Sequence, residues 1–419
     1  MRIPSGQALP VRFLRQNPRC PRPQNSGIIQ IVPQSTTDRR AKQMRFLHTA
    51  DLHLGKRVGE FSLIEDQTYL LNQILEIADH EQPDGVLLAG DIYDKSVPSG
   101  EAVEVFDAFL TALAERGLPV FLISGNHDSP ERLGFGSRIF REKQVHIAGV
   151  FGGAPQKITL TDAYGPVHVF LLPFLKPASA APFFPDDPPE SYTDAVRAAL
   201  AACAPDPSAR NVLVAHQFVT AGSTEPARCD SETISVGGLD NVDASVFDAF
   251  DYVALGHLHG PQRIGRDSVR YAGSPLKYSF SEARQHKSVT LVELAEKGNV
   301  SFRLLPLSPL RDMREICGPL AELLRAGAPT QDYIHATLTD REDVYDAAAR
   351  LRQVYPNLMR LDFEHDALPN TPSKTAASDV ARKSPFTLFA EFFESQNGAP
   401  LSEAERALLG DVLRETEGT

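Results

Sequence analysis

A short apolar run followed at once by a polar cluster recurs along the chain from Met44 to about Ser281. The five runs are MRFLHTAD, DGVLLAGD, PVFLISGNHD, NVLVAHQF and DYVALGHLHG. Runs of this kind are typical of strands that are covered on both faces. Helical patterns such as DQTYLLNQILEIADH and AVEVFDAFLTALAERG lie between them. The alternation predicts an α/β domain over residues 44–285, with helices covering its sheets.

The pattern changes after residue 286. DYIHATLTD, REDVYDAAARLRQVY and NLMRLDFE have the periodicities of a strand, a helix and a strand. They predict a small α+β domain over residues 286–365. Residues 366–384 are polar with little apolar content, which is typical of a linker.

Residues 385–415 return to an amphipathic pattern and predict two short helices. Three phenylalanines share one helical face: Phe389, Phe392 and Phe393. Ser402 and Glu405 have the spacing of a capping box at the start of the second helix. Two such helices cannot bury their apolar faces alone, so the pattern leaves two alternatives open. They fold back on the body, or they dock on a partner.

Composition places the chain among globular proteins, with 42% hydrophobic and 23% charged residues. No run of eighteen or more apolar residues occurs, so we expect no membrane span. The four cysteines are scattered and form no CxxC pair. This spacing argues against a disulfide framework or a thiolate zinc site and fits a reducing cytoplasm.

Charge is distributed unevenly. The net charge is −12, yet residues 1–43 hold eight Lys/Arg and one Asp. We interpret this basic stretch as a disordered extension or a mis-assigned start, with a nucleic-acid-binding arm as the alternative. The acidic remainder disfavours non-specific attraction to phosphates as the main binding force. A nucleic-acid substrate would therefore depend on local basic patches, metal ions or a partner.

Each of the five apolar runs ends in side chains that can bind a metal ion. The candidate ligands are Asp51, His53, Asp91, Asn126, His216, His257 and His259. Singly each motif is weak, because DxH and HxH occur by chance in many chains. Jointly they supply imidazoles, carboxylates and a carboxamide at the carboxyl ends of predicted strands, where ligands bind in α/β sheets. The set predicts a metal site.

Two cations held about 3.5–4 Å apart repel each other, so a two-metal site needs a bridging anion. Asp91 is the natural bridge, because the preceding Gly90 lets the backbone turn tightly. Alternate residues of an extended segment point the same way, so Asp51 and His53 can reach one ion together. The two histidines of GHLH can divide between the ions.

The ligand chemistry narrows the choice of metal. Asn126 offers a neutral oxygen that limits the negative charge. Mixed nitrogen and oxygen ligation suits Mn²⁺, Fe²⁺ or Zn²⁺ and disfavours Ca²⁺. Bridged ions lower the pKa of water, which can then attack a phosphorus atom.

His127 lies next to a candidate ligand and is the candidate proton donor to the leaving group. The alternatives are orientation of the substrate phosphate and bracing of the loop. We expect Asp94 and Asp128 to orient ligands or His127. No G-x-x-x-x-G-K-[ST] motif occurs, so the chain has no P-loop of its own.

With these motifs the chain resembles the calcineurin-like metallophosphoesterases, and more narrowly the SbcD-type nuclease subunits. The narrower resemblance rests on MRFLHTADLHLGK, GDIYDKSVPS, ISGNHDSPERL, DYVALGHLHGPQ and YAGSPLKYSFSE, and covers about residues 44–415. It implies an α/β fold of two stacked mixed β-sheets flanked by helices. A small α+β capping domain and C-terminal helices would follow.

The resemblance also implies a ligand set, with two divalent ions that are usually manganese. The first ion would be bound by Asp51, His53, Asp91 and His259. The second ion would be bound by Asp91, Asn126, His216 and His257. His127 would be the catalytic residue.

The implied activity is 3′→5′ double-strand exonuclease and single-strand or hairpin endonuclease action in DNA repair and recombination. ATP hydrolysis would belong to an SbcC-type ATPase, bound by the C-terminal helices from about Pro385 to Leu413. The resemblance also implies a homodimer within a heterotetramer, acting on DNA ends in the cytoplasm at the nucleoid. The alternatives are a phosphoesterase for nucleotides or phosphoproteins, and an inactive scaffold. The complete set of competent ligands argues against the scaffold.

Overall fold

The computed structural model describes most of the chain from residue 43 to residue 364. Its described ranges are 43–222, 224–232, 240–326, 330–340 and 344–364, followed by 386–387, 389–390, 393, 400–406 and 408–410. The predicted extension 1–43, apart from its last residue, and the predicted linker 366–384 lie outside them. The chain divides into two units, Met1–Asp362 and Phe363–Thr419. No helix within the described ranges is long and apolar enough to cross a membrane.

The first sheet has six strands and is mixed. Its order is β16 (Val300–Pro306), β15 (Ser288–Leu294), β1 (Met44–Thr49), β4 (Gly85–Ala89), β5 (Val120–Ile123) and β6 (Val145–Ala148). The strands β1, β4, β5 and β6 are parallel, whereas β15 runs antiparallel to β1 and β16 antiparallel to β15. The three strands that precede Asp51, Asp91 and Asn126 are therefore neighbours that end at the same edge.

The second sheet also has six strands. Its order is β13 (Gln262–Ile264), β14 (Arg266–Tyr271), β12 (Tyr252–Gly256), β9 (Arg210–His216), β8 (Gly165–Leu172) and β7 (Gln156–Asp162). The four central strands are parallel, and the two edge strands are antiparallel to their neighbours. The strands that precede the last three candidate histidines, β9 and β12, are neighbours here.

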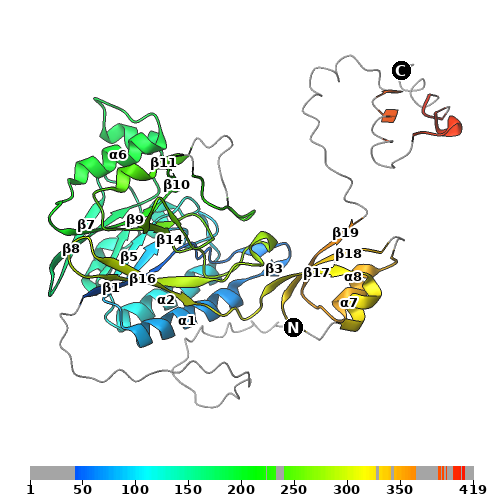
Figure 1. The fold of residues 1–419 in the computed structure, drawn as a ribbon, viewed down its shortest axis with the longest axis horizontal. Helices are drawn as coiled ribbons and strands as arrows, with labels where there is room; N and C mark the ends of the chain where they lie inside the picture. The colour runs from blue at the N-terminus through cyan, green and yellow to red at the C-terminus, as the bar shows by residue number, and fades with distance from the viewer. Residues whose placement is uncertain are drawn as a thin grey trace, which may run out of the picture. The chain divides into compact units, whose positions relative to one another are not determined.

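The two sheets stack face to face. Their shared core includes Phe46, Leu87 and Phe121 of the first sheet and Val214 and Tyr252 of the second, all fully buried. The other face of the first sheet is covered by α1 (Ile64–Glu81) and α2 (Gly100–Glu115), and that of the second by α6 (Tyr192–Cys203) (Figure 1). The predicted fold, two stacked mixed sheets flanked by helices, is confirmed.

Shorter elements complete this domain. They are β2 (Arg57–Val58), β3 (Phe61–Ser62), α3 (Pro130–Leu133), α4 (Ser137–Phe140), α5 (Pro177–Ala180), β10 (Phe218–Thr220), β11 (Asn241–Asp243) and the 3₁₀ turns Arg141–Lys143, Ala181–Phe183, Ala244–Phe247 and Phe280–Glu282. The first 3₁₀ turn follows α4 directly, and the last lies between β14 and β15.

A third sheet forms the smaller α+β part. It has the order β17 (Met313–Gly318), β18 (Tyr333–Leu338) and β19 (Leu358–Phe363), with the helices α7 (Leu320–Ala326) and α8 (Ala347–Arg352). The boundary predicted at residue 286 is corrected, because β15 pairs with β1 and β16 pairs with β15, so both strands belong to the first sheet. β1 and β15 are separated in sequence by almost the whole domain, so local apolar periodicity could not reveal that they pair.

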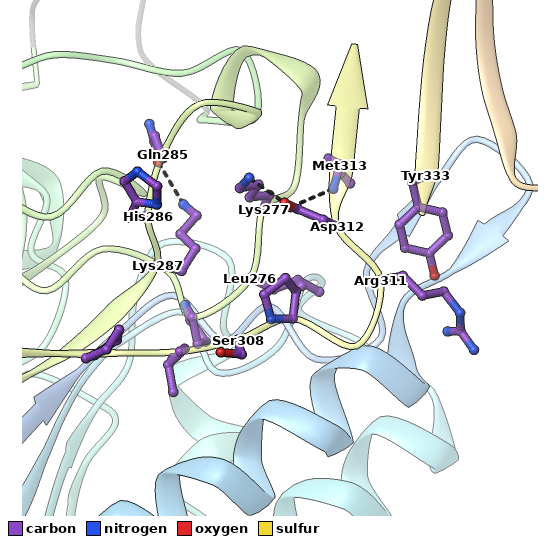
Figure 2. Close-up of a pocket in the computed structure, with 14 residues that line it drawn as sticks. Leu276, Lys277, Gln285, His286, Lys287, Ser308, Arg311, Asp312, Met313 and Tyr333 are labelled. Atoms are coloured by element: carbon purple, nitrogen blue, oxygen red, sulfur yellow. Dashed lines mark hydrogen bonds and ion pairs between the residues drawn. The ribbon is translucent and has the colours of Figure 1, made fainter. Parts of the chain in front are cut away.

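Charged groups attach the third sheet to α1. Asp66 is fully buried, and its Oδ2 accepts hydrogen bonds from Arg311 Nη1 at 2.7 Å and from Tyr333 OH at 2.8 Å. Lys277 Nζ pairs with Asp312 Oδ1 at 2.8 Å at the same junction (Figure 2). The hydrogen bonds from Arg311 and Tyr333 to this buried carboxylate hold the third-sheet part against the two-sheet domain.

In the C-terminal segment the predicted capping box is present. Ser402 N donates to Glu405 Oε2 at 2.8 Å, and Glu405 N donates to Ser402 Oγ at 3.4 Å. Phe392 lies outside the described residues, so the predicted phenylalanine face stays a prediction.

Candidate metal centre

The candidate ligands lie at the carboxyl ends of β1, β4, β5, β9 and β12: His216 is the last residue of β9, and the others lie on the loops that follow the other four strands. The first three strands belong to one sheet and the last two to the other. Because the sheets stack, the ends of both strand groups meet at one rim. All eight predicted site residues are brought together there: Asp51, His53, Asp91, Asn126, His127, His216, His257 and His259.

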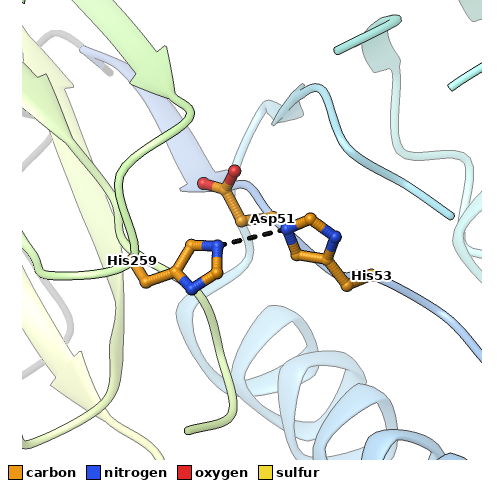
Figure 3. Close-up of side chains that lie close together, drawn as sticks. All are labelled: Asp51, His53 and His259. Carbon is orange, nitrogen blue, oxygen red and sulfur yellow. Dashed lines mark hydrogen bonds between the residues drawn. The ribbon is translucent and has the colours of Figure 1, made fainter. Parts of the chain in front are cut away.

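One donor group consists of Asp51, His53 and His259, whose ligand atoms all lie within 4.8 Å of one another. Figure 3 shows the two imidazoles facing each other below the Asp51 carboxylate, with His53 Nε2 and His259 Nε2 3.1 Å apart. All three side chains are buried. Two ring nitrogens and a carboxylate converging in a buried space are a suitable donor set for a divalent cation.

A second donor group surrounds the Asn126 carboxamide. Asn126 Oδ1 lies 3.0 Å from His216 Nε2 and 2.9 Å from His257 Nδ1. Asp91 Oδ2 lies 3.3 Å from His216 Nε2 and 3.7 Å from His53 Nε2 of the first group. The Asp91 carboxylate therefore lies between the two donor groups.

The backbone at four of these residues is left-handed. The φ angles are 54° at Asp51, 42° at His53, 50° at Asp91 and 104° at His257. The prediction that the DxH and HxH motifs lie on extended segments is therefore wrong. Tight loops, and not strand alternation, direct these side chains. Such conformations are costly for non-glycine residues and cluster at functional sites.

Two glycines leave the space that the ligands need. A Cβ on Gly90, whose φ is 85°, would lie 2.5 Å from His216 Nδ1. A Cβ on Gly256 would collide with the carbonyl oxygen of Ala89 and would lie 2.7 Å from His216 Nδ1. The ring of His216 therefore fits between the ends of β4 and β12 because neither glycine carries a side chain.

Hydrogen bonds fix His127 and the loop that carries it. His127 N donates to Asp91 Oδ1 at 2.9 Å. His127 Nδ1 lies 2.9 Å from the carbonyl oxygen of Asp94, which can only accept, so Nδ1 carries the proton. Asp128 accepts from the backbone of Ile92, Tyr93 and Gly125 at 2.9–3.1 Å. Asp94 thus orients His127 through its carbonyl oxygen, while its carboxylate pairs with Lys56.

Asp91 and His216 form an ion pair at the centre of the site. Burial would lower the pKa of His216, but Asp91 and Asp51 outweigh burial and raise it to about 9. Burial would likewise raise the pKa of Asp91, but His216, His53 and His127 hold it well below its usual value. Asp91 and His216 therefore stabilise each other's charged forms.

Asp51 and His257 have pKa values that are shifted towards their neutral forms. Burial raises the pKa of Asp51 to about 7, partly offset by His216 and His259. Burial and the neighbouring His216 lower the pKa of His257 to about 3. A neutral imidazole is the form that binds a metal ion.

Sequence reasoning missed several residues that support the ligands. Gln67 of α1 donates to the carbonyl oxygen of His53 at 2.7 Å. Glu232 Oε1 accepts from His259 N at 2.7 Å, and Ser231, Glu282 and Lys287 surround the same histidine. One sign of two of these residues was present in the sequence: Glu282 is the charged residue that ends YAGSPLKYSFSE, and Lys287 is a charged residue that follows shortly after it.

The donor chemistry fits divalent ions. The side chains offer imidazole nitrogens, carboxylates and a carboxamide, and His53 Nδ1 and His257 Nε2 are buried without a hydrogen-bond partner among the described residues. His127 also lies in a possible donor group with His53 and Asp91. A variant that lacks the His127 side chain distinguishes a role of this residue in metal binding from a role in proton transfer.

Comparison with known proteins agrees with this geometry. A family model described as calcineurin-like phosphoesterase matches residues 44–261, and one described as Type 5 capsule protein repressor C-terminal domain matches residues 309–397. The chain is 32% identical over 380 residues to the SbcD subunit of the nuclease SbcCD of Staphylococcus epidermidis, with 88% of this chain and 98% of the relative covered. The chain belongs to the SbcD family. As an SbcD-family calcineurin-like phosphoesterase, it is a metal-dependent enzyme.

Two solved structures are similar in part. TT1561 of Thermus thermophilus is 12% identical with a TM-score of 0.35, and a dimetal phosphatase from Danio rerio is 14% identical with a TM-score of 0.37. Each match covers 63% of this chain and 99% of the other. The assignment to the SbcD family rests on the sequence matches.

Proposed function

We propose that this SbcD-family chain is the nuclease subunit of an SbcC–SbcD complex and hydrolyses DNA phosphodiester bonds with two divalent ions. The observation that carries the proposal is the position of Asp91. Its carboxylate lies within 3.3 Å of His216 and 3.7 Å of His53, which belong to two separate donor groups. A bridging anion is what a two-ion phosphoesterase requires.

In this proposal Asp51, His53, Asp91 and His259 hold one ion, and Asp91, Asn126, His216 and His257 hold the other. We propose Mn²⁺, the metal that the resemblance to SbcD-type nucleases implies, and the mix of imidazole nitrogen with carboxylate and carboxamide oxygen is compatible with it. When bound, the ions would supply stabilisation of the negative charge that develops on the phosphate and would lower the pKa of water.

His127 donates a proton to the leaving oxygen or stabilises the transition state. Its Nδ1 proton is engaged by the Asp94 carbonyl oxygen, so Nε2 is the atom that, in the imidazolium form of the ring, holds a second proton and delivers it to the substrate, which leaves a neutral imidazole. The Asp94 carbonyl and the Asp91 carboxylate, which accepts from the His127 backbone, keep that ring in place.

The proposed activities are 3′→5′ exonuclease action on double strands and endonuclease action on single strands and hairpins, in DNA repair and recombination. ATP hydrolysis belongs to the SbcC-type partner, which the C-terminal helices from about Pro385 to Leu413 bind. The proposed setting is the cytoplasm, at the nucleoid. The staphylococcal relative, named as a subunit of the nuclease SbcCD, supports this assignment.

We also propose a homodimer within the heterotetramer. Exposed apolar side chains gather near α3 and α4, where Phe135 is 82% and Ile139 71% exposed. Val97, which is 66% exposed, belongs to the same region, because Arg132 Nη1 donates to the carbonyl oxygen of the adjacent Ser96 at 2.8 Å. Exposed apolar groups of this size are typical of a subunit interface.

The test is digestion of end-labelled hairpin DNA with Mn²⁺, with and without the partner ATPase and ATP. We expect opening of the hairpin and shortening of its ends, dependent on Mn²⁺ and stimulated by the partner with ATP. Intact DNA under all conditions, together with cleavage of nucleotides or phosphopeptides, would instead identify a phosphoesterase of small substrates.

A further inference from the structure

A network of buried polar groups lies behind His259, on the side away from His53. It joins Ser231, which follows β10, to Glu282 and Lys287, which lie five residues apart in the connection between β14 and β15. Glu282 is fully buried, and Lys287 is 6% exposed. A buried ion pair of this kind is expensive to build unless every group is satisfied. The bonds of the network therefore determine what it does.

The carboxylate of Glu282 is surrounded by donors. Its Oε1 accepts from Ser231 Oγ at 2.6 Å and from Tyr278 N at 3.1 Å, and its Oε2 accepts from Lys287 Nζ at 2.6 Å. Because an ammonium and two further donors point at the carboxylate, it acts only as an acceptor. The Ser231 hydroxyl must therefore give its single proton to Glu282.

This assignment fixes the proton on the histidine. Ser231 Oγ also lies 2.8 Å from His259 Nδ1. Since the hydroxyl proton is already used, the hydroxyl can only accept from the ring, so His259 Nδ1 carries the proton. The lone pair of His259 is then on Nε2, the atom that faces His53 in the metal centre.

The backbone of His259 is held by the same network. Lys287 Nζ donates to the carbonyl oxygen of His259 at 2.8 Å, and Glu232 Oε1 accepts from its backbone N–H at 2.7 Å. Both the ring and the main chain of this residue are thus held from behind. Hydrogen-bond partners of this type orient metal-binding histidines and set their tautomer.

We propose that Glu282, acting through the Ser231 hydroxyl and braced by Lys287, is a positioning residue that holds His259 as an Nδ1-protonated tautomer with Nε2 free for a divalent cation. The inference rests on the proposed role of His259 as a ligand. It assigns a function to three residues outside the ligand set. Glu282 and Ser231 do not themselves contact the cation or the substrate.

The test compares Ser231→Ala, Ser231→Thr and Glu282→Gln by calorimetric titration with Mn²⁺ alone. Ser231→Ala removes the hydroxyl while leaving Glu282 paired with Lys287. We expect Ser231→Ala and Glu282→Gln to weaken one of the two ions by about 10–100-fold and to leave the other nearly unchanged. Ser231→Thr, which keeps a hydroxyl, should retain most of the affinity.

Ser281→Ala is the matched control. Its hydroxyl accepts from Asp230 N at 3.0 Å in the same pair of loops but does not contact His259. Equal Mn²⁺ affinity of Ser231→Ala and Ser281→Ala would overturn the proposal.

A second measurement needs neither metal nor DNA. In ¹⁵N spectra of the metal-free protein labelled at histidine, we expect His259 to carry its proton on Nδ1 and to lose that preference in Ser231→Ala. An Nε2-protonated His259 in the unsubstituted protein would overturn the inference. A failure to cut DNA would overturn only the proposed function and would leave this measurement intact.

Discussion

Among single residues, Asp91 and His216 set the chemistry of the metal centre. Their charged groups lie 3.3 Å apart in a fully buried place, and each holds the other in its ionised form. A cation that binds Asp91 and the ring of His216 must displace the proton of that ring. Protons and metal ions therefore compete for the same site.

This competition predicts a pH dependence of metal binding. The pKa of His216 is raised to about 9 and that of Asp51 to about 7 in the protein without metal, so both hold protons at low pH. We expect Mn²⁺ affinity to rise from about pH 6 to about pH 9 and Mn²⁺ binding near pH 8 to release at least about one proton. Titration in buffers of different ionisation enthalpy measures the release. An affinity that does not change over this range would contradict the account.

His127→Ala should keep the metal ions and lose turnover. The side chain supplies proton transfer in our proposal, which is worth about 10²–10⁴ in rate. Rates on labelled DNA, measured together with bound Mn²⁺, check this. A variant that also loses its metal would make His127 a ligand, as its distance to His53 and Asp91 permits.

Among the elements, the sequence allowed the strands to be predicted but not the order in which they pair. The five apolar runs became β1, β4, β5, β9 and β12, and each polar cluster lies at a strand end as predicted. The pairing of β15 with β1 depends on contacts between distant segments, so local periodicity could not reveal it. Left-handed backbone at Asp51 and His257 was also hidden, because loop closure imposes it.

Gly256→Ala tests the close approach of the two sheets. The new Cβ would collide with the carbonyl oxygen of Ala89 and crowd His216, so we expect a loss of about 1–3 kcal/mol in the free energy of unfolding. Gly100→Ala is the control, because its Cβ meets no atom within 4 Å at the start of α2. Denaturant unfolding of both variants measures the difference, and equal stability would refute the packing argument.

For the whole molecule, the net charge of −12 bears on how DNA is held. A chain this acidic gains little from general attraction to phosphates, so in our proposal local basic patches, bound cations or a partner supply the binding of DNA. In the proposed dimer, the exposed Phe135 and Ile139 would give the second copy an apolar surface to bury. The sequence could not place that surface, since exposure follows from the tertiary fold.

Phe135→Asp combined with Ile139→Asp should convert the dimer into a monomer in light scattering, because two charges would be buried without partners. Tyr345→Asp is the matched control. That ring is 92% exposed on the third-sheet part and should leave the mass unchanged. A dimer that survives the double substitution would locate the interface elsewhere.

We propose that five strand ends from two sheets form one centre for two ions, with Asp91 between them. The most direct test is the number of Mn²⁺ ions bound per chain, measured by equilibrium dialysis for the unsubstituted protein and for Asp91→Ala. We predict about two ions for the former and less than about one for the latter, because two cations lose their bridging anion. A single ion in the unsubstituted protein, or two ions that persist in Asp91→Ala, would contradict the account.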